Sequence, residues 1–92
     1  DMIYGDMGRL GLAEAEMQAR QYDAAINEYR GLSTKSNLPT DAILMQLGWA
    51  YAAAGRKAQA QQTFQRILDE FPQSQYAQVA RRELDAVKTS GA

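Results

Sequence analysis

The chain has 92 residues, enough for one small domain with a modest core. Its formal net charge of −1 provides no basic surface for nucleic acid, so we expect no nucleic-acid partner. The absence of Cys and His excludes thiol chemistry, imidazole base catalysis and nearly all structural zinc sites, and we expect no metal and no cofactor. No apolar run approaches the ~18 residues of a membrane-spanning helix. Because the chain begins at Asp1 rather than Met, we expect it to be a fragment of a longer protein.

The first predicted helix covers Asp6–Arg20, where apolar residues recur at steps of three and four. A short turn at 21–23 separates it from a second helix that extends to about residue 32, with Asp23 as its N-cap or first-turn acid. The segment 33–39 is polar and ends in proline, which predicts a loop.

The third predicted helix begins between Pro39 and Asp41 and continues through Ala54. Either Thr40 caps this helix or Pro39 occupies its first turn. Gly55 is suited to a left-handed C-cap. Residues 50–54 are alanines apart from Tyr51, so we expect that a partner backbone can approach this helix closely.

A fourth helix is predicted from Lys57 to the Phe71–Pro72 pair, and a fifth from Ser74, a suitable N-cap, to about Val87. The closing residues 89–92 are expected to be loosely held. All of these elements are helices, so the expected fold class is all-α.

Two parts of the chain coincide when one is shifted by 35 residues along the other. The shift places Ala25 on Ala60, Tyr29 on Phe64 and Ala13 on Gly48. A self-similar period in the mid-thirties, built from helix-forming residues, is typical of stacked helix–turn–helix units.

The second of these parts carries a specific motif. Positions 44, 47, 48, 51, 60, 64 and 72 hold Leu, Leu, Gly, Tyr, Ala, Phe and Pro. This resembles the tetratricopeptide repeat, Trp-x-x-Leu-Gly-x-x-Tyr, then Ala-x-x-x-Phe, then Pro, with Leu44 in place of Trp. The first part departs from the pattern, because Glu16 stands at the place of the first helix's aromatic residue and Asn37 at that of the proline.

The resemblance implies a right-handed α–α superhelix in a single domain over residues 1–92. Its parts would be one repeat at about 6–37, a second at about 39–72 and a C-terminal capping helix at about 74–88. It also implies that Gly48 and Ala60 are small because the two helices of a repeat cross there. Tyr51 and Phe64 would be large because they fill the space opened by the next repeat.

Members of this family are noncatalytic scaffolds that bind peptide segments or partner domains, so the resemblance implies a groove for a protein partner. By helical spacing its lining would be Leu10, Glu14, Met17, Met45, Trp49, Ala53, Tyr76 and Glu83. This set is mostly apolar with sparse acid, which suits an apolar or weakly basic peptide.

Some of these residues have a second interpretation. Trp49 is either an interface anchor or a packing residue beside Tyr76 or Val79. Met17 and Met45 either make the groove adaptable or fill gaps between helices. Outside the groove, the Arg81–Arg82 pair is a solvated face or a docking site for a carboxylate or lipid phosphate.

An alternative function is self-assembly into a homo-oligomer. Two repeats and one helix are fewer than the three repeats usually needed for stability, so exposed ends could pair between chains. An enzymatic function has little support, because no carboxylate pair has convergent spacing and Ser33, Lys35 and Ser36 lie in a polar loop.

The segment 71–80 suggests a location. Its Phe-Pro-x-Ser-x-x-Ala-x-x-Ala pattern resembles the linker of bacterial cell-envelope tetratricopeptide proteins. This resemblance favours a periplasmic or membrane-anchored protein over a cytoplasmic one, and a role in envelope assembly or secretion.

Overall fold

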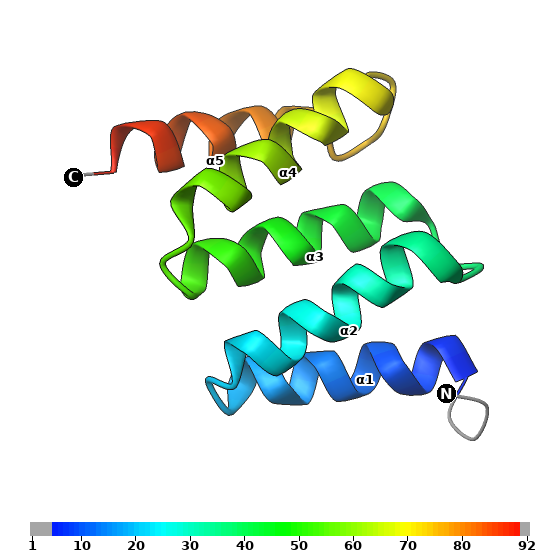
Figure 1. Ribbon diagram of the computed structural model, residues 1–92. Coiled ribbons are helices and arrows are strands. Elements are labelled where there is room, and N and C mark those ends of the chain that lie inside the picture. Colours follow the sequence, from blue (N-terminus) through cyan, green and yellow to red (C-terminus); the bar gives the residue numbers. More distant parts are fainter. Residues whose placement is uncertain (1–4, 91–92) are drawn as a thin grey trace.

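The computed structural model describes residues 5–90, and within this range it contains five α-helices and no strand (Figure 1). The helices are α1 (Gly5–Gln18), α2 (Tyr22–Lys35), α3 (Thr40–Ala53), α4 (Lys57–Glu70) and α5 (Ala77–Thr89). The all-α prediction is therefore confirmed. Residues 91 and 92, part of the end that was expected to be loosely held, lie outside the described residues, as do residues 1–4.

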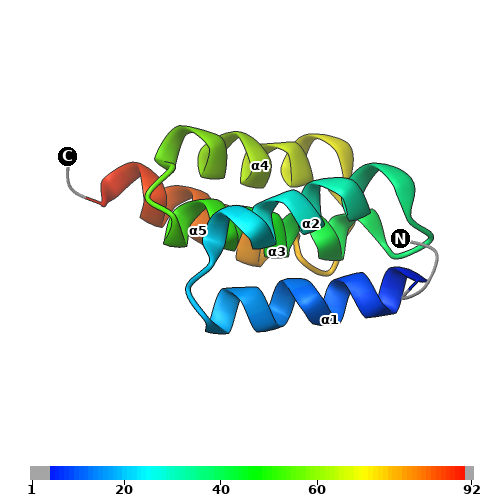
Figure 2. The same cartoon turned by 60° about the horizontal axis from the view of Figure 1, so that its bottom comes forward.

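The helices form a stack of hairpins rather than a bundle closed around one axis. Each helix packs on the next one in chain order, from α1 on α2 to α4 on α5. Figure 2 shows α2 and α4 along one side of the stack and α1, α3 and α5 along the other. The molecule measures 41 × 29 × 15 Å, so it is long and thin. Each helix has its own set of neighbouring helices, and these neighbours determine which of its faces stay exposed.

Gly48 allows α3 and α4 to approach each other. A Cβ atom at this position would lie 2.5 Å from Cε1 of Phe64, closer than real Cβ contacts occur. The Phe64 ring is fully buried. The expectation that Gly48 is small because the helices of its repeat cross there is confirmed. The Phe64 ring lies against Gly48 of its own repeat, where the missing Cβ makes room. That it also fills space opened by the next repeat stays a prediction.

The first helices of both hairpins end in the same backbone motif. Arg20 and Gly55, which are 35 residues apart, have positive φ angles of 62° and 78°. In each turn the backbone N–H of the next residue donates to the carbonyl oxygen five residues earlier. These bonds run from Gln21 to Glu16 at 2.8 Å and from Arg56 to Tyr51 at 2.9 Å. This is the Schellman pattern, which satisfies carbonyls at a helix end. The left-handed conformation predicted for Gly55 is confirmed.

Several helix ends differ from the prediction. Helix α1 ends at Gln18 because Arg20 adopts the left-handed conformation that closes the turn. Asp23 lies in the first turn of α2, and this helix continues to Lys35. Pro39 precedes α3 at the N-cap position instead of entering its first turn. Thr89, expected to be loose, is the last residue of α5 and its hydroxyl donates to the Asp85 carbonyl at 3.0 Å.

Thr40 does not cap a helix, because it is the first residue of α3. Helix α5 begins three residues after Ser74, at Ala77, but the Ser74 hydroxyl accepts the N–H of Tyr76 at 2.9 Å, which is a capping-type bond in the turn before α5. The same hydroxyl donates to Oδ2 of Asp41 at 2.6 Å. Ser74 therefore ties the linker before α5 to the first turn of α3.

The buried core is unevenly distributed over the helices. Helix α3 contributes seven buried residues, while Ala13 is the single fully buried residue that α1 contributes within the described range. The reason is that α3 packs on both α2 and α4, whereas α1 packs mainly on α2. Helix α3 is consequently apolar on nearly all sides, including the small part of it that remains exposed.

Candidate binding surface

The exposed face of α3 consists entirely of apolar residues. These residues are Trp49, Ala52 and Ala53, which are three and four positions apart and therefore share one side of the helix. Trp49 has 36% of its surface exposed. An exposed helix face normally carries polar side chains. We refer to these three residues as the α3 stripe, which is a surface that an apolar ligand can cover.

A hollow between α3 and α5 extends the stripe. Ala52 lines it together with Ala86 and Val87 of α5. Lys57 and Ser90 also line it, and the Lys57 ammonium donates to the Ser90 carbonyl oxygen at 2.6 Å. Because the apolar side chains here are small, an extended backbone can come close to both helices.

The eight residues predicted to line a groove differ in exposure. Glu14, Trp49 and Ala53 are exposed, Leu10, Met17, Tyr76 and Glu83 are half-buried, and Met45 is buried. Leu10, Met17 and Tyr76 pack partly against the core, so each offers only part of its side chain to a ligand.

Met45 has to be removed from the predicted lining. Its side chain is 1% exposed and belongs to the core, where it fills space between helices. The prediction failed because α3 has neighbours on more sides than an isolated repeat would suggest. On a helix with neighbours on several sides, a position that helical spacing assigns to the surface can be buried, as Met45 is.

Sequence reasoning missed two residues of this surface, Ala52 and Ala86. The signal for Ala52 was present, because residues 52–54 are all alanine. Ala86 had no such signal. Its place beside Ala52 depends on how α5 lies along α3, and the linker that orients α5 is irregular.

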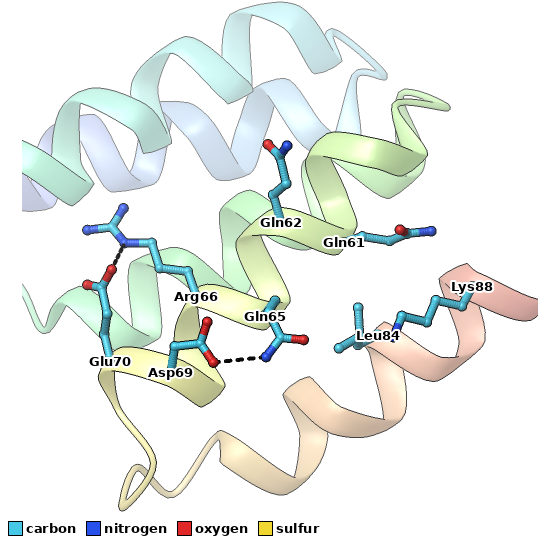
Figure 3. A pocket seen from close by; sticks show the side chains of 8 residues that line it. All are labelled: Gln61, Gln62, Gln65, Arg66, Asp69, Glu70, Leu84 and Lys88. Carbon is cyan, nitrogen blue, oxygen red and sulfur yellow. Dashed lines mark hydrogen bonds and ion pairs between the residues drawn. The ribbon is translucent and has the colours of Figure 1, made fainter.

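A second hollow, between α4 and α5, is lined mostly by polar residues (Figure 3). Arg66 donates to Glu70 at 3.0 Å and Gln65 donates to Asp69 at 2.9 Å. These pairs are four residues apart on α4, as is typical of a solvated helix face. The apolar residue in its lining, Leu84, is only 1% exposed. This hollow therefore resembles ordinary helix surface rather than a site.

The surface of α1 has an excess of acid. Oε1 of Glu16 is buried and has no hydrogen-bond partner within the described residues. Burial raises the pKa of Glu16, and the nearby charge of Glu28 raises it further. Glu28 accepts a hydrogen bond from Nε of Arg9 at 2.9 Å. Burial also raises the pKa of Tyr29, to which the charges of Glu14 and Glu16 add.

Arg81 and Arg82 are both exposed on α5. They border an open hollow together with Leu68, Ala77 and Gln78. Within residues 5–90 neither arginine is part of an ion pair, as expected for a solvated face.

Two further searches covered the same range of the chain. Across residues 5–90, no three or more acidic side chains gather closely enough to hold a metal ion. In that range no helix combines the length and the apolar character needed to cross a membrane.

Comparison with protein families identifies residues 42–74 as a match to the family model described as tetratricopeptide repeat. The matched segment contains α3, α4 and the beginning of the linker to α5. It includes the motif at positions 44–72, so the resemblance read from that motif is confirmed. No curated protein and no solved structure matches the chain.

Proposed function

We propose that this chain holds a peptide segment of a partner protein on the α3 stripe, because residues 42–74 match the tetratricopeptide repeat, a module that typically binds other proteins without catalysis. Stacked repeats of this kind present extended surfaces of adjacent helices. The proposal concerns which of these surfaces is used and what chemistry it selects.

The apolar character of the α3 stripe carries the proposal. Trp is the residue type most enriched among the hot spots of protein interfaces. Here Trp49 is followed on the same face by Ala52 and Ala53, so a large anchor stands beside a region without bulk. A partner can place an apolar side chain against the indole while its backbone crosses the alanines.

The charged residues among the predicted groove positions, Glu14 and Glu83, are acidic and favour a weakly basic partner. Glu14 occupies on α1 the position that Trp49 occupies on α3, because the two are 35 residues apart and α1 and α3 lie on the same side of the stack (Figure 2). Glu14 is exposed, and Glu83 on α5 is half-buried. We therefore infer that the peptide carries a Lys or Arg near its apolar anchor.

Fluorescence gives a direct test, because Trp49 is the single Trp of the chain. Two sets of synthetic ten-residue peptides would be compared, both with an apolar centre, one flanked by lysines and the other by glutamates. We expect the lysine set to shift the Trp49 emission and to bind about tenfold more tightly, which corresponds to 1.4 kcal/mol.

Variants separate the α3 stripe from other exposed apolar side chains. In anisotropy measurements with a labelled lysine-flanked peptide, Trp49→Ala should abolish binding, while Leu12→Ala, which truncates an exposed apolar residue of α1, should leave it unchanged. Equal binding by Trp49→Ala and the parent chain, or equal affinity for both peptide sets, would overturn the proposal.

We further propose that the protein acts in a bacterial cell envelope, in assembly or secretion. Support comes from the linker at 71–80, whose pattern resembles that of envelope proteins with this repeat. In this chain Ser74 of the linker also has a structural role, through its bond to Asp41. Fractionation of the native cell with an antibody to the chain tests the location, and recovery from the cytosol would refute it.

A further inference from the structure

A third hollow lies over α3 on the side opposite the α3 stripe, and we call it the α2–α4 hollow. Helices α2 and α4 both pack on α3, and both contribute residues to its lining. From α3 it is lined by Leu44, Leu47 and Tyr51, which share one face of that helix. Leu47 and Tyr51 are each two positions from Trp49, and residues two apart point to different sides of a helix.

The lining of the α2–α4 hollow is basic. It contains Arg30 of α2 and Arg66 of α4, and no acidic side chain of residues 5–90 belongs to it. Arg30 forms no ion pair with any residue in that range. Arg66 donates to Glu70 through Nε. Figure 3 shows Gln62 and Arg66 on the side of α4 that is turned away from Leu84 of α5. The hollow therefore offers positive charge with nothing inside it to balance that charge.

Tyr51 gives independent evidence for a ligand in the α2–α4 hollow. Its side chain is only 7% exposed, and its hydroxyl has no hydrogen-bond partner within the described residues. The hydroxyl oxygen is nevertheless not fully enclosed, so the small exposed part of Tyr51 includes it. The hydroxyls of Ser33, Thr34 and Thr63 also line the hollow, but each donates to a backbone carbonyl of its own helix. The Tyr51 hydroxyl is thus the hydroxyl in this lining whose proton is available to an acceptor.

These groups suit the carboxylate of a glutamate side chain. Guanidinium groups donate to carboxylates with well-matched geometry, and a phenol and an amide N–H add further donors. Leu44 and Leu47 are 1% and 6% exposed and form an apolar floor on which methylene groups can lie. The volume of about 280 Å³ is several times the roughly 30 Å³ of one water, so a whole side chain can enter. A phosphate needs the same donors but has no apolar part for this floor.

We propose that the α2–α4 hollow binds a glutamate side chain from an acidic peptide segment of a partner protein. Arg30, Arg66 and the Tyr51 hydroxyl are the donors to its carboxylate. The two faces of α3 then select opposite charges, an apolar and weakly basic peptide at the α3 stripe and an acidic one at the α2–α4 hollow. The two sites share no residue, so the two proposals stand or fall independently.

The probe is a labelled synthetic peptide of glycine and serine with glutamates at its centre, and the reference peptide has glutamines in their place. Neither peptide has an apolar side chain for the α3 stripe to hold. In anisotropy measurements we expect the glutamate peptide to bind about tenfold more tightly than the glutamine peptide. In the NMR spectrum of the ¹⁵N-labelled chain it should perturb amides of residues 30–34 and 62–66.

Two variants test the donors, and a third is the matched control. Tyr51→Phe removes the hydroxyl and keeps the ring, so it should weaken binding of the glutamate peptide about threefold. It should not lower the melting temperature, because it removes no hydrogen bond made within residues 5–90. Arg30→Gln should weaken binding about fivefold. Arg81→Gln removes the same charge from an exposed arginine outside the hollow and should leave the affinity unchanged.

Four results would overturn the proposal. Equal affinity for the glutamate and glutamine peptides would mean that the hollow does not select a carboxylate. Equal losses in Arg30→Gln and Arg81→Gln would mean that net charge alone attracts the peptide. A Tyr51→Phe chain that binds like the parent would leave only ordinary surface arginines. Tighter binding of a phosphoserine peptide than of the glutamate peptide would make phosphate the ligand.

Further measurements keep this proposal distinct from the proposed function. The Trp49→Ala chain should bind the glutamate peptide as the parent does. The Arg30→Gln chain should bind the lysine-flanked apolar peptide as the parent does. Failure at one face would therefore leave the result at the other face interpretable.

Discussion

The two helical hairpins have equivalent positions 35 residues apart, but different residue types stand at many of them. Where the second hairpin turns at Gly55, the first turns at Arg20, and both residues have positive φ. Where the second has Tyr51, the first has Glu16. The family match covers the second hairpin, at residues 42–74. The backbone motif thus persists where the characteristic side chains do not, because the turn depends on carbonyl hydrogen bonds that any residue can complete at some cost in strain.

A polar link in the first hairpin occupies the place of an apolar contact in the second. Arg9 is equivalent to Leu44, which is 1% exposed. The Arg9 guanidinium lies over Gly31, where a Cβ atom would be 2.5 Å from Nη2, and its Nε donates to Glu28 at 2.9 Å. Since α1 packs mainly on α2 within the described residues, a charged group here keeps contact with water. The second hairpin, α3 and α4, follows the repeat pattern. The first hairpin, α1 and α2, departs from it on the side of α1 where no helix of residues 5–90 packs.

Removal of the Phe64 ring would break the second hairpin and should have the largest effect. The ring is fully buried against Gly48. Phe64→Ala should lower the free energy of unfolding by about 3–5 kcal/mol, measured by urea titration followed by circular dichroism. Met7→Ala, at a residue 67% exposed, is the control and should change it by less than about 0.5 kcal/mol. A loss below about 1.5 kcal/mol for Phe64→Ala would contradict the packing described here.

The same substitution should have opposite effects at two glycines. Gly48→Ala places a Cβ atom 2.5 Å from the Phe64 ring and should destabilise the chain by about 1–3 kcal/mol through overpacking. Gly11→Ala meets no atom within 4 Å and should stabilise it by about 0.5–1 kcal/mol through helix propensity. Thermal and urea unfolding of both variants measures the difference. Equal signs would show either that the Phe64 ring yields to a Cβ atom at Gly48 or that Gly11 is more crowded than described here.

Substitutions at the two residues with positive φ should change the free energy of unfolding in opposite directions, each by about 1 kcal/mol. Gly55→Ala puts a side chain at a φ of 78° and should cost about 1–2 kcal/mol. Arg20→Gly relieves the same conformation in the first turn and should gain up to about 1 kcal/mol. Urea midpoints of the two single variants and of the double variant provide the measurement. A destabilised Arg20→Gly chain would show that the arginine side chain contributes more than its backbone strain costs.

Sequence patterns predicted what depends on local chemistry and missed what depends on neighbours. Helical periodicity and the glycines sufficed for five helices and for the left-handed turn at Gly55. Met45 was assigned to a surface because spacing identifies a side of a helix but not what lies beside it. Ser74 was predicted as a cap, but its hydroxyl also donates to Asp41, 33 residues away. Such contacts are set by the arrangement of helices, which local patterns do not encode.

The pH dependence of stability should show the smallest difference between the hairpins. Burial, and secondly the charge of Glu28, raise the pKa of Glu16 above its usual value of 4.5. Between 4.5 and the raised value the folded chain therefore holds more protons than the unfolded chain. The contribution of Glu16 to stability is thus fully present below pH 4.5 and is lost as the pH rises through the raised pKa.

Glu16→Gln removes this titration and keeps the shape of the side chain. The free energy of unfolding of the variant minus that of the parent should therefore increase between pH 4 and pH 7, measured by urea titration at each pH. A difference that stays constant with pH would mean that burial does not perturb the pKa of Glu16. The Glu16 carboxylate would then be no less stable in the folded chain than in the unfolded chain.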